Sequence, residues 1–304
     1  MIDSVLLIAF GGPAAPEDVG PFLDRVSRGR SIPPARLAEV ARHYALMPGG
    51  RSPLNELTRA QASALERLLW AEDLALPVFV GQRNCHPFLH ETLAQMAARG
   101  HRRALGIIMS SFRAEASWDR YMVDVAEARA RVGGAPEVAF APAWGQHPLF
   151  VAAVTDRAAE ALAEVPPAER RWTPMVFTAH SVPVAMAEGS PYVSDFEQAA
   201  HAVVERLDQP RLILAYQSRS GSPRDPWLDP DVNDVIKSLA ADGEKRVVIV
   251  PIGFVCDHVE ILYDLDVEAR GLAEAQGIAF HRARAVNDHP EFIAMLAHLV
   301  RDAR

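Results

Sequence analysis

Cysteine is scarce in this chain: only Cys85 and Cys256 occur in 304 residues, and they form no C-x-x-C motif. A four-cysteine zinc or iron–sulfur site within one chain is therefore excluded, and a disulfide framework is not expected. We interpret both thiols as buried or half-buried groups in a reducing cytosol, where disulfides rarely persist.

Long hydrophobic runs are absent as well. No stretch reaches the roughly 18 uninterrupted apolar residues that a membrane helix needs, so no transmembrane segment is expected. The apolar start, Met1–Phe10, is short and carries an Asp but no basic residue, which indicates a buried strand and not a signal peptide. We therefore predict a cytoplasmic protein, and we leave contact with a membrane surface open.

Positive charge is in deficit, with 31 Lys and Arg against 39 Asp and Glu and a net charge of −8. These basic residues do not gather into long runs, so nucleic acid is not an expected partner.

Two common ligand-binding and catalytic motifs are missing. Gly11–Pro13 follows the first apolar run without a G-x-G-x-x-G pattern, which argues against a dinucleotide site. These glycines form either a tight turn or an open backbone that a ligand can approach. The chain has no G-x-S-x-G elbow, so a serine hydrolase is not indicated.

Short apolar runs alternate with longer amphipathic stretches along the whole chain. The runs lack polar alternation, which is typical of parallel strands buried on both faces. Strand–helix alternation of this kind predicts an α/β fold, with about four strands in each of two similar domains. We place the domains at residues 1–145 and 146–304, and we expect the last helix to be able to pack back on the first domain. The predicted strands are Val5–Phe10, Pro77–Gly81, Ala104–Ser110, Val138–Ala143, Met175–Thr178, Leu212–Tyr216, Val247–Ile252 and Ile278–His281. The predicted helices are Pro34–Leu46, Leu54–Trp70, Phe88–Arg99, Leu149–Glu164, Phe196–Leu207 and Glu291–Arg301.

Polar residues gather directly after several predicted strands, where ligands bind in sheets of this type. His180 follows one strand, and an imidazole there is a base, a metal ligand or a purely structural group.

An acidic segment follows another strand. We expect Asp257 to cap a helix on which Glu260, Asp264 and Glu268, spaced four apart, share one face. That face is either solvated or a ladder for a divalent cation. Imidazole and carboxylate suit iron and other divalent metals, and we expect His180 and Glu260 on opposite sides of a cleft to form a weak, open site.

An aromatic residue and several arginines complete the candidate residues. Trp227 either packs in the core or stacks against a flat aromatic ligand. Arg28, Arg30 and Arg51 are either solvated surface residues or carboxylate-binding forks.

Taken together, seven segments resemble ferrochelatases, in order, over nearly the whole chain. No single segment is specific, but the joint match is. The segments are Leu6–Pro13, Gly49–Leu54, Gly81–Pro87, Ala179–Pro183, Gln217–Arg219, Pro226–Pro230 and Gly253–Asp266.

The resemblance implies two Rossmann-like domains, each with a four-stranded parallel sheet, and a porphyrin cleft between them. It implies that His180 and Glu260 are catalytic and that Asp264 and Glu268 form an acidic relay behind them. These four residues are the predicted metal-handling set. The predicted substrate-binding residues are Phe10, Arg28, Arg30, Ser52, Trp227 and His258.

The resemblance also implies Fe²⁺ as a substrate. Some members of the family carry an iron–sulfur cluster, which two cysteines cannot supply, so none is expected here. A second divalent cation, Mg²⁺, is also expected near Glu268. Some members place a tyrosine on the first loop as a ligand of product iron, and this chain has Phe10 there.

Within the family, residues 28–33, Tyr44 and Gly49–Leu54 are similar to the coproporphyrin-using branch found in actinobacteria. Ser110–Tyr121 lacks the usual aromatic pattern of the protoporphyrin-using enzymes, which points the same way. The expected activity is insertion of Fe²⁺ into coproporphyrin III, giving coprohaem III, in haem biosynthesis. Three alternatives stay open: a protoporphyrin IX ferrochelatase, a chelatase for cobalt or nickel, and a non-catalytic haem-binding or haem-transfer protein. Transient contact with other haem-pathway enzymes is a further expectation.

Overall fold

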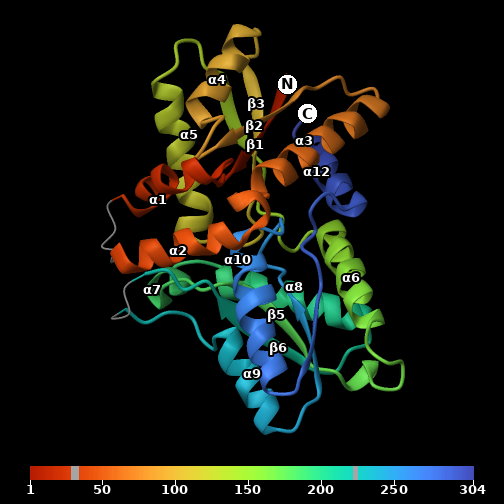
Figure 1. Ribbon diagram of the computed structural model, residues 1–304. Coiled ribbons are helices and arrows are strands. Elements are labelled where there is room, and N and C mark those ends of the chain that lie inside the picture. The colour runs from red at the N-terminus through yellow and green to blue at the C-terminus, as the bar shows by residue number, and fades with distance from the viewer. Residues whose placement is uncertain (29–33, 222–224) are drawn as a thin grey trace.

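The computed structural model describes residues 1–28, 34–221 and 225–304. Eight strands in these ranges form two separate four-stranded parallel sheets, one in each half of the chain (Figure 1). The first sheet contains β1 (Ser4–Ala9), β2 (Val78–Gln82), β3 (Arg103–Ile108) and β4 (Glu137–Phe140). The second contains β5 (Met175–His180), β6 (Leu212–Gln217), β7 (Arg246–Val250) and β8 (Ala279–Arg282). The predicted α/β fold is confirmed, and each predicted strand overlaps an observed one.

Helices connect the strands and cover the sheets (Figure 1). In the first half they are α1 (Val19–Ser27), α2 (Pro34–Leu46), α3 (Leu54–Ala71), α4 (Leu89–Ala98) and α5 (Arg120–Ala130). In the second half they are α6 (Pro148–Ala163), α7 (Val184–Glu188), α8 (Tyr192–Arg206), α9 (Val232–Ala241), α10 (Val259–Leu262), α11 (Arg270–Ala275) and α12 (Pro290–Asp302). Short 3-10 turns are η1 (Pro16–Asp18), η2 (Pro48–Gly50) and η4 (Arg170–Trp172), and π-helical turns are η3 (Glu115–Asp119) and η5 (Asp264–Ala269).

The core explains why the apolar runs become strands. All six residues of β1 are buried, because helices cover both faces of the sheet, and Leu6 and Leu7 have no exposed surface. On α3 the fully buried Leu65 and Leu69 are four residues apart and therefore lie on one face of the helix.

The two sheets share one strand order, and that order positions the functional residues. The sequence of neighbours is β2-β1-β3-β4 in the first sheet and β6-β5-β7-β8 in the second. In the first sheet β2 is added on one side of β1, and β3 and β4 are added on the other side. The second sheet is built in the same way around β5. This reversal of direction creates a switch point between β1 and β3 and another between β5 and β7. Crevices at such points, beyond the carboxyl ends of the strands, are where α/β proteins bind ligands.

The loops beyond the carboxyl ends of the two sheets contact each other. The Ser111 hydroxyl, after β3, donates a hydrogen bond of 3.2 Å to the carbonyl of Ile252, after β7. The Gln61 amide, on α3, donates to the carbonyls of Val255 at 3.2 Å and Asn287 at 2.8 Å. Two ligand-binding edges therefore face one another across the middle of the molecule.

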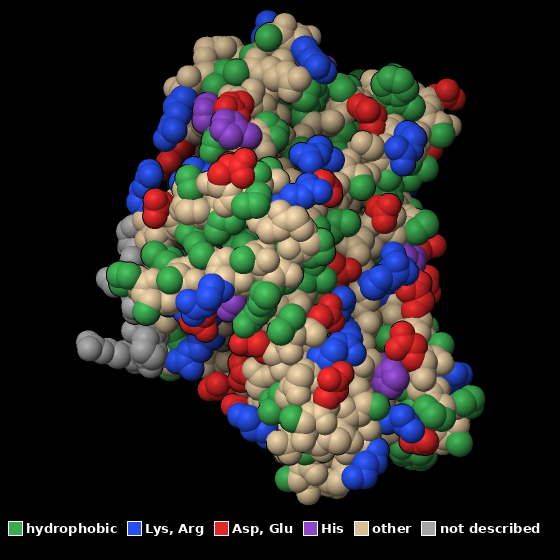
Figure 2. All heavy atoms as spheres, viewed as in Figure 1, with side chains coloured by type: hydrophobic (Ala, Val, Ile, Leu, Met, Phe, Trp, Pro, Cys, Tyr) green, Lys and Arg blue, Asp and Glu red, His purple; other side chains and the backbone are tan. Residues whose placement is uncertain are grey.

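The last helix joins the two halves. α12 packs against α6 of the second half and against α3 of the first, and the chain ends beside the first half (Figure 1). The division of the chain into domains at residues 145 and 146 stays a prediction. None of the helices in the described ranges is long and apolar enough to cross a membrane. On the face shown in Figure 2, acidic and basic side chains are intermixed.

Candidate active site

His180 is the last residue of β5 and is held in place by its neighbours. Its carbonyl accepts a hydrogen bond of 2.8 Å from the Tyr192 hydroxyl on α8. Its Nδ1 faces the Ser181 carbonyl, which only accepts, so Nδ1 carries the proton and donates. The neutral ring then has its lone pair on Nε2, which is the atom free to bind a metal ion or accept a proton.

Glu260 lies next to that lone pair. Its Oε1 is 4.0 Å from Nε2 of His180, and both side chains are partly exposed, at 38% and 29%. The side-chain amide of Gln217, the last residue of β6, donates a hydrogen bond of 2.7 Å to the Glu260 carbonyl. This contact fixes the backbone of the residue that carries the carboxylate. The expectation that the two residues lie on opposite sides of a cleft is wrong. His180 ends β5 and Glu260 lies on α10 after β7, the neighbouring strand of the same sheet, so the two side chains stand side by side.

The cap of the helix that carries Glu260 is also different from the prediction. His258 is the N-cap of α10, and its Nδ1 accepts from the Glu260 backbone N–H at 3.3 Å. Burial lowers the pKa of His258, which keeps Nδ1 unprotonated and able to accept. Asp257 does not cap because its carboxylate is already bonded to Arg282 and Asn287, which lie later in the chain.

The acidic row runs along a helix that is not regular. After α10 the backbone turns into the π-helical η5, in which the Glu268 N–H donates 3.0 Å to the Tyr263 carbonyl five residues earlier. The expected single α-helix with carboxylates at every fourth position is therefore wrong. The carboxylates still influence one another, because the charges of Glu260 and Glu268 both raise the pKa of Asp264.

Asp264 is the perturbed member of the row. Burial is the main cause that raises its pKa to about 7, and the two neighbouring carboxylates add to the rise. The Ser218 hydroxyl donates to its Oδ2 and lowers the pKa in part. A carboxyl group with a pKa near 7 both takes up and releases a proton at neutral pH. Glu268, at the far end of the row, is exposed to solvent.

The two halves meet over this row. The rings of His43 on α2 and Tyr263 are stacked, with centroids 3.5 Å apart. Tyr44 and Val259 belong to one buried apolar cluster formed by α1, α2 and α10. Burial is the main cause that raises the pKa of Tyr44, and the charge of Glu260 adds to this rise.

Four of the predicted substrate-binding residues belong to the first half, and two of them, Phe10 and Ser52, lie near the turn after β1. Phe10 follows β1, is 40% exposed and packs edge-on against Phe22. Ser52 is buried, and a side chain on Gly12 would approach its Cβ to 2.6 Å, so Ser52 supports the glycine turn after β1. In this structure Phe10 is therefore the more accessible of the two.

The remaining predicted residues are more scattered. Trp227 is 8% exposed; its ring lies over Gly221, and the Arg219 guanidinium is 5.8 Å from the ring centroid. Arg28 is exposed at the end of α1, and Arg30 lies outside the described residues. The substrate-binding roles of these residues stay predictions.

Ser218 and Arg83 lie in two of the segments that resemble ferrochelatases, Gln217–Arg219 and Gly81–Pro87, but no role was predicted for them. Ser218 follows β6 directly and has a positive φ of 61°. Arg83 follows β2 directly, lies 4.3 Å from the Tyr121 ring and 5.8 Å from the Phe10 ring, and pairs with Asp124. The position after a strand was a usable signal for both residues, whereas the partners of Arg83 are distant in sequence.

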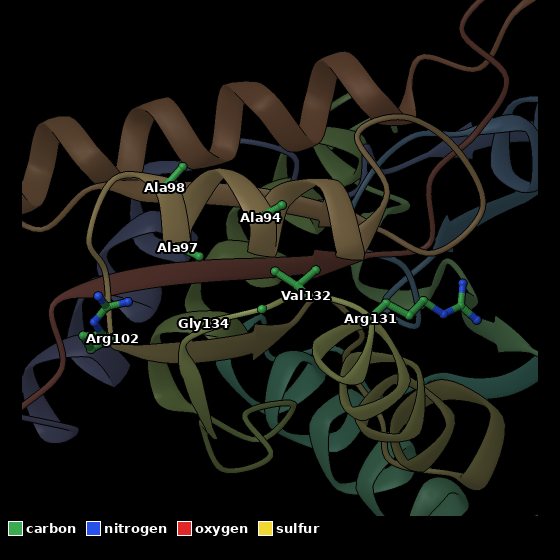
Figure 3. Close-up of a pocket in the computed structure, with 8 residues that line it drawn as sticks. Ala94, Ala97, Ala98, Arg102, Arg131, Val132 and Gly134 are labelled. Carbon is green, nitrogen blue, oxygen red and sulfur yellow. The ribbon is translucent and has the colours of Figure 1, made fainter.

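Two hollows in the described residues lie away from His180 and Glu260. One of about 610 Å³ is lined by α4 and by Arg102 and Gly134, which precede β3 and β4 (Figure 3). It is therefore at the amino edge of the first sheet, away from the ligand-binding edge. A second, of about 300 Å³, lies between η3 and α7. Neither is lined by His180 or Glu260.

Across residues 1–28, 34–221 and 225–304, no three or more His, Cys, Asp or Glu side chains form a group that could hold a metal ion. The four predicted metal-handling residues therefore form a pair, His180 and Glu260, followed by a row, and not one coordination shell. Cys85 and Cys256 are buried and are not joined by a disulfide.

Comparison with known proteins decides the family. The family model for ferrochelatases matches residues 3–304. The chain belongs to the ferrochelatase family. The predicted enzyme class, a metal chelatase, is thereby confirmed, and Fe²⁺ and a porphyrin are the substrates that this ferrochelatase family implies.

Several curated ferrochelatases are similar over almost their full length. A ferrochelatase of Rhodopirellula baltica is 40% identical, and the match covers 99% of this chain and 86% of the relative. A coproporphyrin III ferrochelatase of Mycolicibacterium paratuberculosis is 43% identical, with 99% and 88% covered. One of Streptomyces griseus subsp. griseus is 40% identical, with 98% and 84% covered.

Solved chelatase structures share the fold of this ferrochelatase. SirB from Bacillus subtilis with Fe³⁺ has a TM-score of 0.61 at 10% identity, and the match covers 99% of this chain and 95% of SirB. CbiX, described as the terminal enzyme of sirohaem biosynthesis in denitrifying bacteria, has a TM-score of 0.57 at 15% identity, with 99% of both chains covered. These likenesses concern the fold alone.

Proposed function

We propose that this ferrochelatase inserts Fe²⁺ into coproporphyrin III, giving coprohaem III, with His180 and Glu260 as its catalytic residues. The observation that carries the choice of porphyrin is the sequence identity of 40–43% with curated coproporphyrin III ferrochelatases over nearly the whole chain. The 4.0 Å pair at the switch point between β5 and β7 carries the choice of residues.

Metalation requires that Fe²⁺ lose water, that two pyrrole N–H groups lose their protons, and that the ring bend so that its nitrogen lone pairs reach the metal. Binding energy from the periphery of the ring supplies the bending. His180 suits the second requirement because its side chain is partly exposed and its Nδ1 contact to the Ser181 carbonyl leaves Nε2 as the ring atom that can accept a proton. We assign it the first acceptance of a pyrrole proton, with Fe²⁺ presentation as the alternative role of the same atom.

The acidic row suits removal of that proton. Glu260 lies 4.0 Å from Nε2, so it is the nearest carboxylate that can take the proton from His180. Asp264, with a pKa of about 7, is matched to receive it and release it again, and the exposed Glu268 delivers it to solvent. The partial exposure of His180 and Glu260 suits a site that holds iron only during transfer.

A fluorescence assay tests the proposed function. Purified protein receives anaerobic Fe²⁺ with either coproporphyrin III or protoporphyrin IX, and porphyrin emission is followed at catalytic enzyme concentration. We expect many turnovers with coproporphyrin III and a kcat/KM at least about tenfold lower with protoporphyrin IX, a difference of about 1.4 kcal/mol. A change in emission that stops at one porphyrin per protein would identify a binding protein. Preferential turnover of protoporphyrin IX would identify that porphyrin as the substrate instead. Parallel reactions with Co²⁺ and Ni²⁺ test the metal.

We also propose a second divalent cation, Mg²⁺, near Glu268. Partial burial raises the pKa of Glu268, and Arg36 opposes this rise. Glu39 and Asp231 raise it further, so several carboxylates share this surface, and a cation would relieve their repulsion. Millimolar Mg²⁺ should raise the melting temperature of the parent protein but not of Glu268→Gln. An equal rise in melting temperature in both proteins would contradict the proposed Mg²⁺ site.

Two cellular expectations also belong to the proposal. We place the enzyme in the cytoplasm, with transient contact with other haem-pathway enzymes or with a membrane surface. Cell fractionation with a specific antibody tests the compartment, and recovery of the whole protein in the membrane pellet after a salt wash would contradict it.

A further inference from the structure

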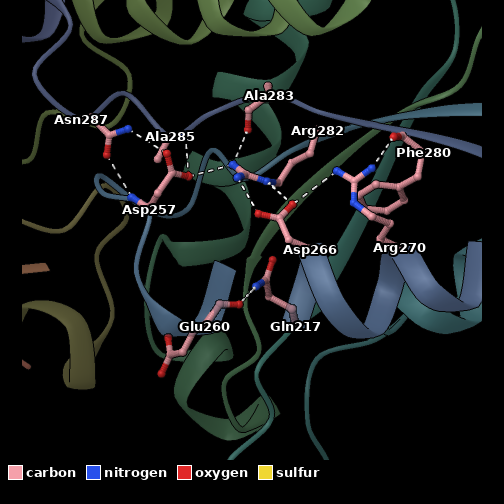
Figure 4. Close-up of polar contacts among 10 residues, drawn as sticks. All are labelled: Gln217, Asp257, Glu260, Asp266, Arg270, Phe280, Arg282, Ala283, Ala285 and Asn287. Carbon is pink, nitrogen blue, oxygen red and sulfur yellow. Dashed lines mark hydrogen bonds and ion pairs between the residues drawn. The ribbon is translucent and has the colours of Figure 1, made fainter. Parts of the chain in front are cut away.

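Arg282, the last residue of β8, occupies the centre of a polar network beside the acidic helix (Figure 4). Its side chain is only 10% exposed. Nε and Nη2 donate to the two carboxylate oxygens of Asp266, each at 2.7 Å, and Nη1 donates to Oδ1 of Asp257 at 2.7 Å. One guanidinium thus forms a two-pronged contact with one acid and a third strong contact with another.

The two acids lie on either side of Glu260 in the sequence. Asp257 ends the loop after β7, three residues before Glu260, and Asp266 is in η5, six residues after it. The segment between them begins at the cap residue His258 and contains the irregular transition from α10 into η5. Arg282 therefore ties together both ends of the segment that carries the carboxylate.

The anchor on the Asp257 side is rigid. Its Oδ1 also accepts from the Ala285 N–H at 3.2 Å, and its Oδ2 accepts from the Asn287 side-chain amide at 2.8 Å. Asn287 returns the contact by accepting from the Asp257 N–H at 2.9 Å. The Asn287 carbonyl accepts from Gln61 on α3, so the network extends to the first half of the molecule.

The anchor on the Asp266 side is reinforced in the same way. Arg270, four residues later, lies 3.6 Å from Oδ1 of Asp266 and donates 3.0 Å to the Phe280 carbonyl of β8. From the opposite side, Gln217 holds the Glu260 carbonyl. Figure 4 shows Glu260 with Gln217 below the Asp257–Arg282–Asp266 bridge.

We infer that Arg282 is a positioning residue that sets the place of the Glu260 carboxylate opposite Nε2 of His180 by bridging Asp257 and Asp266. This inference rests on the proposed function, in which Glu260 takes part in metalation. A shift of about 1 Å in a reacting group commonly costs on the order of 100-fold in rate. Loss of the bridge would leave Asp257 held by Asn287 and Asp266 held by Arg270, but it would remove the direct link between the two ends of the Glu260 segment.

Lysine is the informative replacement. Arg282→Lys keeps the positive charge between the two acids, but a single ammonium cannot reproduce the planar fork to Asp266 and the contact to Asp257 together. The matched control is Arg246→Lys, in the first residue of β7. Arg246 makes a similar fork to Glu169, with contacts of 2.7 and 3.4 Å, at the opposite end of the same sheet.

Steady-state kinetics of Fe²⁺ insertion into coproporphyrin III form the first part of the test. Folding of each variant is checked by circular dichroism, and the assay temperature lies well below every melting temperature. Arg282→Lys should lower kcat at least about tenfold while KM for the porphyrin changes less than about twofold. Arg246→Lys should keep both constants within about twofold of the parent.

The second part asks whether Arg282 acts through Glu260. Single-turnover insertion is measured with enzyme in excess for Glu260→Gln with and without Arg282→Lys. In the Glu260→Gln background the Arg282→Lys change should cost less than about twofold, because interacting residues are not additive. An unchanged kcat in Arg282→Lys, or the same fold-loss in both backgrounds, would overturn the inference. A parent enzyme without turnover would instead refute the proposed function.

Discussion

Nε2 of His180, the last residue of β5, and Oε1 of Glu260, on α10 after the neighbouring strand β7, are 4.0 Å apart. The Nδ1 contact to the Ser181 carbonyl turns the lone pair of His180 toward this carboxylate. A base and a carboxylate thus stand together where the strand order reverses, and the acidic row leads from them to solvent.

Replacement of Glu260 by glutamine keeps the shape of the side chain and removes its charge. We expect kcat for Fe²⁺ insertion to fall by roughly 10²–10⁴-fold, because neither proton transfer nor charge stabilisation remains. Steady-state fluorescence kinetics measure the effect, with the surface variant Glu169→Gln as the control. A kcat of the Glu260→Gln enzyme within about threefold of the parent value would show that Glu260 takes no part in the mechanism.

Asp264 makes stability depend on pH. Its folded-state pKa of about 7 lies above the ordinary value of 3.8, so between these pH values the folded protein binds a proton that the unfolded chain has lost. The parent therefore loses stability as pH rises through this window. Asp264→Asn should be free of this loss and melt roughly 5–15 °C above the parent at pH 8, with the gap closing toward pH 4. Calorimetry from pH 4 to pH 8 measures the melting temperatures of the parent and the variant. A difference between them that widens toward low pH would contradict the raised pKa of Asp264.

Ser218 stabilises the ionised form of Asp264 through its hydroxyl. Ser218→Ala removes this donor, so the pKa of Asp264 should rise further. If Asp264 accepts a proton during turnover, the acid limb of the kcat profile should move to higher pH by about 0.5–1 unit. The measurement is kcat from pH 5.5 to 9. A limb that stays in place would show that ionised Asp264 is not required.

Gly253 lies where the loop after β7 passes β5. A Cβ there would come within 2.5 Å of the Ala179 Cα, next to His180, so Gly253→Ala must push the two strand ends apart. We expect a loss of about 1–3 kcal/mol in the free energy of unfolding. We also expect at least about a tenfold loss in kcat.

Gly271→Ala is the matched control for this change. Gly271 lies within α11 and has open space around its Cα, so alanine should stabilise the helix by roughly 0.5–1 kcal/mol without affecting kcat. Urea unfolding and kinetics on both variants form the test. Equal effects of the two substitutions would mean that the close approach at Gly253 is unimportant.

Much of the fold was readable in the sequence because it depends on local hydrophobic patterns. The runs that became β1 and β5 are apolar without alternation, and α2 begins at Pro34 and ends at Leu46 as predicted. The rule that ligands bind beyond the ends of strands brought His180 and Glu260 to attention. The homologous motifs then gave them roles that the residues alone left open.

What the sequence did not reveal depends on partners that are distant along the chain. Asp257 has the right residue type for an N-cap, but Arg282 and Asn287 occupy its carboxylate and leave His258 as the cap. Residues 259–269 have the pattern of an ordinary helix, whereas the chain forms a π-turn at η5. The placement of His180 beside Glu260, and not across from it, follows from the strand order, which no local pattern encodes.

The most direct test of the central claim is the single-turnover rate of anaerobic Fe²⁺ insertion into coproporphyrin III by His180→Ala. The account predicts that this variant folds, binds the porphyrin with unchanged affinity, and inserts iron at least about 10³-fold more slowly than the parent, because the base beside Glu260 is gone. A His180→Ala enzyme with near-normal turnover would contradict the account.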